Sequence, residues 1–365
     1  MKQSSKQRIF ISDCEGPISK NDNAFELVSH YIPDGNRLFT LISKYDDILA
    51  DIVKRVDYKA GDTLKLILPF LKAYGVTNQA ITDYSSKNVL LVPEAKEMLH
   101  FVQNFMPSFI VSTSYEQYMR ALCNLVDFPF ENVHCTRLNL DKYKISEKEA
   151  YQIKRLREKM VPMPIPEIPK DAESLSDFPK EYQNSVKRLD EIFWKELAQM
   201  SVGAMLREVN PVSGNEKAEA VQNIVAKLKS ELNNVMYVGD SITDVSAFKL
   251  VREKGGLTVS FNGNAYAVRE AEIAVLSENA LVTAVLADAF NKLGKEPFMK
   301  LVKDWKASTL DDFGLTQPLK KHFFKLHQKK LPRVEIVTAQ NMDRLMEEST
   351  VFRKTVRGEA IGKLG

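Results

Sequence analysis

Short apolar runs that end in polar residues recur along this chain of 365 residues. They are rich in Val, Ile, Leu and Phe, which is typical of buried strands. Amphipathic patterns with helical spacing follow most of them. Because strands that alternate with helices form βαβ units, the pattern predicts a parallel sheet and an α/β fold. The predicted strands cover residues 9–12, 89–92, 108–114, 234–239, 257–261 and 273–276.

Two long stretches carry helical patterns without strands. The first lies within residues 18–88, with helices predicted at 24–32 after an Asn23 cap, at 38–56 and at 64–74. The second lies within 137–209, with charged helices predicted at 145–160 and 181–200. From about residue 279 onwards the pattern is again mostly helical.

Alternating prolines separate the two charged helices, in the segment from Val161 to Pro169. Proline fixes φ and lacks the amide hydrogen, so this segment is predicted to be extended rather than helical. We interpret it as a rigid connector. A PxxP ligand for a protein partner is the alternative.

The charge and the cysteine content indicate which partners and which cellular compartment to expect. Lys and Arg number 51 against 48 Asp and Glu, a net charge of +3, which does not favour nucleic acid or membranes as partners. Three cysteines without CxxC spacing fit a reducing, cytoplasmic location. No signal-peptide pattern or apolar run of membrane-spanning length is visible. The cysteines are Cys14, Cys123 and Cys135.

The region after residue 319 is rich in Lys and Arg and poor in acids. We interpret these cations as a solvated helical face. A surface for a protein partner or for nucleic acid is the alternative. The residues are Lys320, Lys321, Lys325, Lys329, Lys330, Arg333, Arg353, Lys354 and Arg357.

Paired acids follow two of the predicted strands. Asp13 and Glu15 come after residues 9–12, and Asp240 and Asp244 come after residues 234–239. Alternate residues of an extended segment point the same way, so Asp13 and Glu15 are predicted to face one site. Open α/β sheets bind ligands at the carboxyl ends of their strands. The acids therefore mark a candidate active site.

Their chemistry fits phosphoryl transfer. Asp13 can act as the nucleophile and Glu15 as the acid and base. Asp240 and Asp244 offer the hard carboxylate oxygens that Mg²⁺ prefers. Cys14 lies between the first two acids and could be read as a nucleophile, but no base follows it, and we interpret it as a packing residue.

Phosphate binding requires donors as well as a metal ion. Ser112 and Thr113 lie at the end of the strand at 108–114, where their hydroxyl groups can donate to phosphate oxygens. Lys217 lies at the start of a predicted helix that runs from residue 214 to 232. Its charge can offset the acids and hold an aspartyl-phosphate.

In this order, the four stretches resemble the four motifs of the haloacid dehalogenase-like superfamily. Motif I is similar to residues 9–16, motif II to 109–112 and motif III to the region of Lys217. Motif IV is similar to residues 238–244, which show a GDxxxD pattern. The layout is also similar to that of uncharacterised archaeal members of the superfamily.

The resemblance implies a Rossmann-like parallel sheet and Mg²⁺-dependent chemistry through an aspartyl-phosphate on Asp13. It implies that the Glu15 carbonyl joins Asp13 and Asp240 on the metal, and that Ser112 and Lys217 hold the phosphate. The implied division is a Rossmann-like core at 1–17, 89–136 and 210–288, a helical cap insert at 18–88, a second helical insert with the proline-rich connector at 137–209, and a helical C-terminal extension at 289–365.

One position departs from the family pattern, because Glu15 stands where the family usually has Asp. The added methylene moves the carboxyl group, and misplacement by about 1 Å can cost on the order of 10²-fold in rate. We nevertheless expect a phosphohydrolase or phosphotransferase that acts on a small phosphorylated metabolite. The alternative is a regulatory or accessory subunit that uses the same fold to bind a protein partner with little catalysis.

Overall fold

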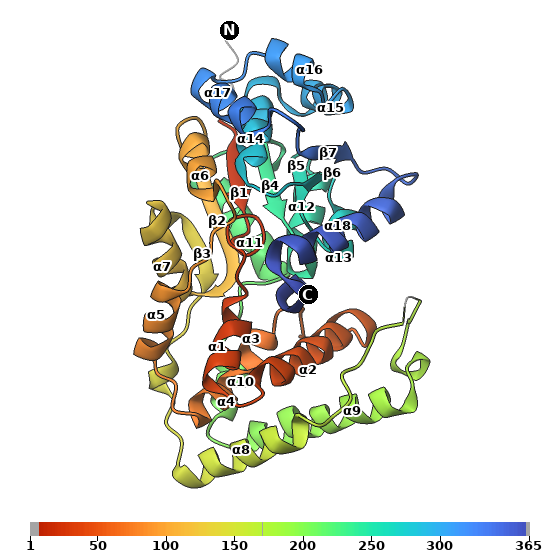
Figure 1. The fold of residues 1–365 in the computed structure, drawn as a ribbon. Coiled ribbons are helices and arrows are strands. Elements are labelled where there is room, and N and C mark those ends of the chain that lie inside the picture. The colour runs from red at the N-terminus through yellow and green to blue at the C-terminus, as the bar shows by residue number, and fades with distance from the viewer. Residues whose placement is uncertain (1–6, 170, 363–365) are drawn as a thin grey trace.

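The computed structural model describes residues 7–169 and 171–362. A seven-stranded sheet in the order β3-β2-β1-β4-β5-β6-β7 forms its centre (Figure 1). Neighbouring strands are parallel, except that β7 runs antiparallel to β6. The predicted α/β fold with a Rossmann-like parallel sheet is therefore confirmed. The strands are β1 (Ile9–Ser12), β2 (Ser108–Tyr115), β3 (Val133–Thr136), β4 (Val235–Gly239), β5 (Leu257–Phe261), β6 (Ile273–Leu276) and β7 (Arg333–Ile336).

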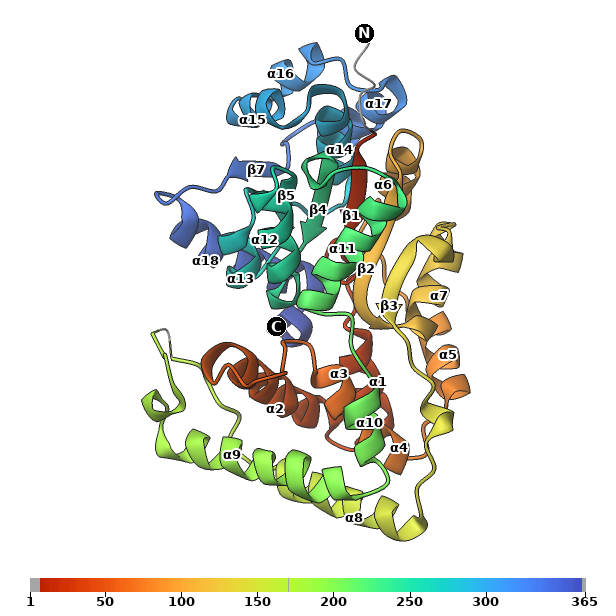
Figure 2. The same ribbon diagram turned by 180° about the vertical axis from the view of Figure 1, so that it is seen from behind.

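Helices cover both faces of the sheet, which explains why its strands are apolar throughout rather than alternating (Figures 1 and 2). In β1, Phe10 packs into the cluster on one face, whereas Ile9 and Ile11 pack into the cluster on the other. The first face is covered by α6 (Ala95–Gln103), α7 (Glu116–Val126) and α14 (Leu281–Leu293). The second face is covered by α11 (Asn215–Lys227), α12 (Val245–Glu253) and α13 (Ala265–Glu270).

A separate group of helices with its own apolar cluster lies beyond the carboxyl ends of the strands (Figure 1). It combines helices from both strand-free stretches, and Tyr45 stacks on Phe193 across them with ring centroids 5.7 Å apart. Residues 164–169 have no regular secondary structure between two of its helices. The helices are α1 (Asn23–Tyr31), α2 (Gly35–Asp47), α3 (Thr63–Leu66), α4 (Leu68–Ala73), α5 (Asn78–Lys87), α8 (Glu147–Met160), α9 (Lys180–Glu191) and α10 (Gly203–Glu208).

The C-terminal region packs beside the sheet and then returns to the carboxyl ends of its strands. Besides the predicted helices it contributes β7, a strand that the sequence pattern did not reveal. The last long helix, α18, ends close to the junction of the sheet and the helical group (Figure 1). The helices are α15 (Lys295–Lys303), α16 (Ala307–Asp312), α17 (Gln317–Leu326), α18 (Met342–Arg357) and α19 (Glu359–Gly362).

Short helical turns complete the described structure. Two π-helical turns, Ile48–Ile52 and Ile192–Glu196, continue α2 and α9, so that the long predicted helices at 38–56 and 181–200 are only partly α-helical. The 3₁₀ turns are Phe130–Asn132, Leu140–Lys142, Leu175–Asp177, Leu197–Gln199, Leu232–Asn234 and Ile242–Asp244. The outer parts of the predicted core and C-terminal extension, residues 1–6 and 363–365, lie outside the described residues.

Two local predictions were wrong. Residues 89–92 form no strand of the sheet, because β2 and β4 already occupy both edges of β1; Leu91 makes only an isolated bridge with Ser19. Helix α1 is capped by Asp22 rather than by Asn23. The Asp22 carboxylate accepts a hydrogen bond of 2.9 Å from the Phe25 amide, which places Asn23 inside the helix.

Candidate active site

The strand order brings the two acidic loops together. From β1 the chain moves to β2 on one side and later returns to β4 on the other, so the order reverses at β1. Such a reversal leaves a crevice at the carboxyl ends of the strands, where ligands bind. Asp13 follows β1 and Asp240 follows β4, and the Asp13 amide donates to the Val238 carbonyl at 2.8 Å.

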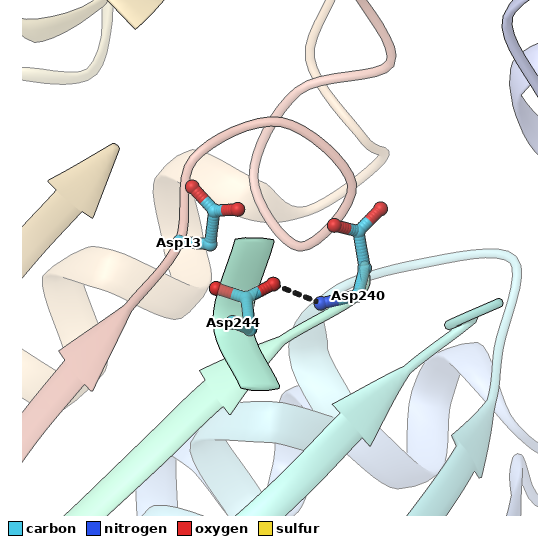
Figure 3. Close-up of side chains that lie close together, drawn as sticks. All are labelled: Asp13, Asp240 and Asp244. Atoms are coloured by element: carbon cyan, nitrogen blue, oxygen red, sulfur yellow. Dashed lines mark hydrogen bonds between the residues drawn. The ribbon is translucent and has the colours of Figure 1, made fainter. Parts of the chain in front are cut away.

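Three carboxylates meet in this crevice. Asp13, Asp240 and Asp244 are buried, and each offers an oxygen within 4.8 Å of the others. Figure 3 shows Asp13 and Asp240 on either side of Asp244. Such a set of hard oxygens fits the coordination preferences of Mg²⁺.

Asp244 holds the loop that carries Asp240. One of its oxygens accepts the backbone amides of Asp240 (2.9 Å) and Ser241 (3.1 Å). The other accepts the Lys217 ammonium at 2.7 Å and the Tyr237 hydroxyl at 2.8 Å. Because four donors already use its two oxygens, Asp244 can bind a metal directly only by giving up one of these bonds.

Lys217 forms ion pairs with a carboxylate of each acidic loop. It stands in the first turn of α11, is fully buried, and places its ammonium 2.6 Å from Asp13 and 2.7 Å from Asp244. Burial disfavours the ammonium, but Asp13 and Asp244 outweigh this cost and raise the pKa of Lys217 above its ordinary value. The lysine therefore remains charged beside the carboxylate predicted to be the nucleophile.

The two acids of the first loop lie in different surroundings. Burial raises the pKa of Asp13, and Lys217 opposes that shift. The Glu15 side chain accepts the Asn23 amide at 2.8 Å. Burial, followed by the charge of Asp22, raises the pKa of Glu15 well above its ordinary value. A carboxyl group that keeps its proton can act as a general acid.

Gly16 makes the close approach of the two loops possible. Its φ is +106°, and a Cβ atom built on it would lie 2.1 Å from the Asp240 carboxylate. A side chain at this position would therefore both strain the backbone and displace Asp240.

A cavity of about 100 Å³ lies next to the carboxylates of Asp13 and Asp240. The predicted residues Asp13, Glu15, Thr113 and Asp240 line it. Ser112 is buried beside it, and its hydroxyl accepts a hydrogen bond of 3.2 Å from the Ser114 amide. The rest of the wall comes from Asp22, from α2, from the segments 61–64 and 241–243, and from α18.

Two arginines of α18 belong to this wall. The guanidinium groups of Arg353 and Arg357 both bind one carboxylate oxygen of Asp240, Arg357 at 3.1 Å. Arg357 also donates to the backbone carbonyls of Lys20 (3.1 Å) and Asn21, and so ties α18 to the loop after β1.

The prediction of a solvated face was therefore wrong for Arg353 and Arg357. Arg353 is only 3% exposed, and the side chain of Arg357 only 5%. Their spacing of four residues, which puts them on one side of a helix, was the available signal. No local pattern reveals a partner 113 residues away in the chain.

Residues 79–288, more than half of the chain, match the family described as haloacid dehalogenase-like hydrolase. The chain belongs to this family. The resemblance to this family is thus confirmed, and the protein is a haloacid dehalogenase-like hydrolase. The matched range contains Ser112, Lys217 and Asp240, whereas Asp13 lies before it.

The chain is similar to a solved structure over nearly its whole length. This structure is that of gene product AF1437 from Archaeoglobus fulgidus, with a TM-score of 0.79 and 26% sequence identity, covering 98% of this chain and 99% of that chain. No curated protein matches the chain.

Cys14 has the surroundings of a packing residue. It is fully buried in the apolar cluster on one face of the sheet, and burial raises its pKa well above its ordinary value. All three cysteines are free. Within the described part of the chain, no helix combines the length and the apolar character needed to cross a membrane.

Proposed function

We propose that this hydrolase is a Mg²⁺-dependent phosphohydrolase or phosphotransferase, and that Asp13 forms an aspartyl-phosphate with a small phosphorylated metabolite. The main support for the proposal is that the buried Lys217 ammonium forms ion pairs with both Asp13 and Asp244, and that Asp240 lies beside them. A fold without catalysis gains little from burying these charges, because their desolvation is costly.

In the first step, an Asp13 oxygen attacks phosphorus and the bond between phosphorus and the leaving oxygen breaks. Glu15 gives its proton to that oxygen, so the product leaves as a neutral alcohol. Lys217 holds Asp13 in place and balances the negative charge of the phosphoryl group. Thr113, which lines the cavity, can donate to a phosphoryl oxygen, with Ser112 beside it.

In the second step, Glu15 is a carboxylate and takes a proton from water, whose oxygen attacks phosphorus. The bond to Asp13 breaks, phosphate leaves, and both acids return to their initial states. In a phosphotransferase an alcohol takes the place of water.

Asp13 and Asp240, with the Glu15 carbonyl, would hold the Mg²⁺ ion, and Asp244 would fix the loop that presents Asp240. When bound, the ion neutralises phosphate charge and orients the phosphoryl group for attack. The helical stretches at 18–88 and 137–209 would act as caps that select the substrate, since the first supplies part of the cavity wall.

The test is phosphate release from p-nitrophenyl phosphate and a panel of phosphorylated metabolites, with Mg²⁺ or with a chelator. We expect turnover only with Mg²⁺, and a loss of about 10³-fold or more in kcat for Asp13→Asn, which removes the nucleophile. Asp312→Asn is the matched control, because Asp312 is exposed on α16, and it should leave kcat unchanged.

Turnover that survives in Asp13→Asn would exclude the aspartyl-phosphate. A folded wild type that binds Mg²⁺ but releases no phosphate from any substrate would instead favour the accessory-subunit alternative.

A further inference from the structure

Helix α18 brings two cations into the cavity from the far end of the chain. Arg353 and Arg357 lie one turn apart and both reach the Asp240 carboxylate. They are the only cationic side chains among the described residues that line the cavity. The charged side chains that line the cavity are therefore mainly acids, and the basic ones all come from α18.

The acids that face the cavity are already occupied by donors of the chain itself. Asp46 accepts the Tyr58 hydroxyl at 2.6 Å, the Gly61 amide at 2.8 Å and the Thr63 hydroxyl at 2.9 Å. Asp47 pairs with Lys44 at 3.0 Å. As described above, Asp22 caps α1 and Glu15 binds the Asn23 amide. Asp22, Asp46 and Asp47 thus serve the fold. The other acids of the cavity have the catalytic and metal-binding roles proposed above, so little capacity remains for a substrate cation.

The buried polar groups of the cavity that lack a hydrogen-bond partner are ones that can donate. Among its lining residues, two buried polar atoms have no hydrogen-bond partner, the hydroxyl of Thr113 and Nε of Arg353. Leaving a buried donor unpaired costs about 1–3 kcal/mol. A ligand that supplies oxygen acceptors would remove this cost at both positions.

The arginine pair also carries more positive charge than its shared partner. Two guanidinium groups bind a single carboxylate oxygen of Asp240. The Arg353 group uses Nη1 for Asp240, which leaves the edge at Nε for another acceptor. The planar fork of arginine matches carboxylate and phosphate oxygens, which makes an anion the fitting ligand.

We propose that Arg353, supported by Arg357, binds a second anionic group of the substrate, so that the substrate is a small phosphate monoester that also bears a carboxylate or a second phosphate. This inference rests on the proposed function. The cavity of about 100 Å³ limits the separation, and the second group lies within a few bonds of the phosphate that is transferred.

The experiment compares substrates of similar size that differ in the second anion. Phosphoglycolate is matched with ethyl phosphate, and 3-phosphoglycerate with glycerol 1-phosphate. In the wild type we expect kcat/KM to be about 10- to 100-fold higher for the acidic member of each pair, the range of a charge-assisted hydrogen bond. Arg353→Gln should bring this ratio close to one, mainly through a higher KM for the acidic member.

Two further variants test whether the ratio of kcat/KM values depends on the charge and the shape of the Arg353 side chain. Arg344→Gln is the matched control, because Arg344 lies on the same helix and pairs with Glu335 and Glu348 outside the cavity. It should leave the ratio at the wild-type value. Arg353→Lys keeps the charge without the fork and should retain an intermediate ratio.

The outcomes separate this inference from the proposed function. A ratio near one in a wild type that turns over both members would overturn the inference and leave the proposed function intact. Equal losses for both members in a folded Arg353→Gln would also overturn it, since Arg353 would then act only on Asp240. If no phosphate ester is turned over, the proposed function itself fails. The wild-type ratio decides the matter even if Arg353→Gln does not fold.

Discussion

Lys217 is the residue that contacts both acidic loops, and its buried positive charge balances their carboxylates. Its ammonium binds Asp13 and Asp244, whose charges would otherwise repel each other in a buried crevice. The sequence predicted all three residues from their places after strands and at a helix start. It could not predict that Asp244 would use one oxygen for the amides of its own loop and the other for Lys217 and Tyr237, because that depends on how α11 and β4 pack around this loop.

Glu26 provides a test of the electrostatics at the edge of this site. It accepts two hydrogen bonds of 2.8 Å from the Asn21 side chain, and burial raises its pKa to about 7. Because this is above its ordinary value, the folded state binds the Glu26 proton more tightly than the unfolded state does. Ionising Glu26 therefore lowers the free energy of unfolding as the pH rises from about 4.5 to about 7.

We expect Glu26→Gln to match the wild type near pH 4 and to be more stable by about 1–2 kcal/mol at pH 8, a figure reduced for partial exposure. Urea unfolding at both pH values measures this difference. Glu253→Gln, at an exposed position on α12, is the control. An equal stability difference between Glu26→Gln and the wild type at both pH values would contradict the expectation.

At the scale of elements, the turn after β1 is the tightest point of the site. Gly16→Ala would place a methyl group within 2.1 Å of the Asp240 carboxylate and strain a φ of +106°. We expect kcat/KM to fall by about 10²-fold or more, because Asp240 would be displaced. Steady-state kinetics with p-nitrophenyl phosphate measures the loss.

Gly75 offers a matched comparison for this substitution. It also has a positive φ, of +79°, but no atom lies within 4 Å of a Cβ built there. Gly75→Ala should cost about 1 kcal/mol of stability through backbone strain alone and leave kcat/KM unchanged. Similar kinetic losses in both variants would mean that the clash with Asp240 is not what matters.

Other elements show where sequence patterns succeed and fail. The apolar runs of β1, β2, β4, β5 and β6 were recognised because strands buried on both faces need continuous apolar sequence. The edge strands β3 and β7 were missed, since polar residues interrupt them: β3 reads Val-His-Cys-Thr and β7 reads Arg-Val-Glu-Ile. The run at 89–92 is equally apolar, yet it packs beside the turn after β1, because the sheet has no free edge there.

At the scale of the whole molecule, the cavity has walls from three distant parts of the chain. The strand ends supply Asp13, Glu15 and Asp240, the helical group beyond them supplies α2 and segment 61–64, and the C-terminal region supplies α18 (Figure 1). A divalent ion bound in this cavity would stabilise the assembled fold over the unfolded chain, in which the ligands are far apart.

We therefore expect Mg²⁺ to raise the melting temperature, with a gain of about 2.7 kcal/mol at a concentration 100 times its dissociation constant. Thermal unfolding with increasing Mg²⁺, and after addition of a chelator, measures the shift. Asp240→Asn should lose most of it and Asp312→Asn should keep it. A shift of the same size in Asp240→Asn would place the bound ion elsewhere.

The sequence by itself determined the α/β class, the apolar strands that carry the acids, and the acids and the lysine that meet in the crevice. These follow from local patterns, since apolar runs become buried strands and residues after parallel strands share one edge of the sheet. Only the tertiary structure decided that α18 closes the site and that Arg353 and Arg357 reach Asp240. A helical pattern states which residues share a face, but the partner of that face is fixed by packing between segments far apart in the chain.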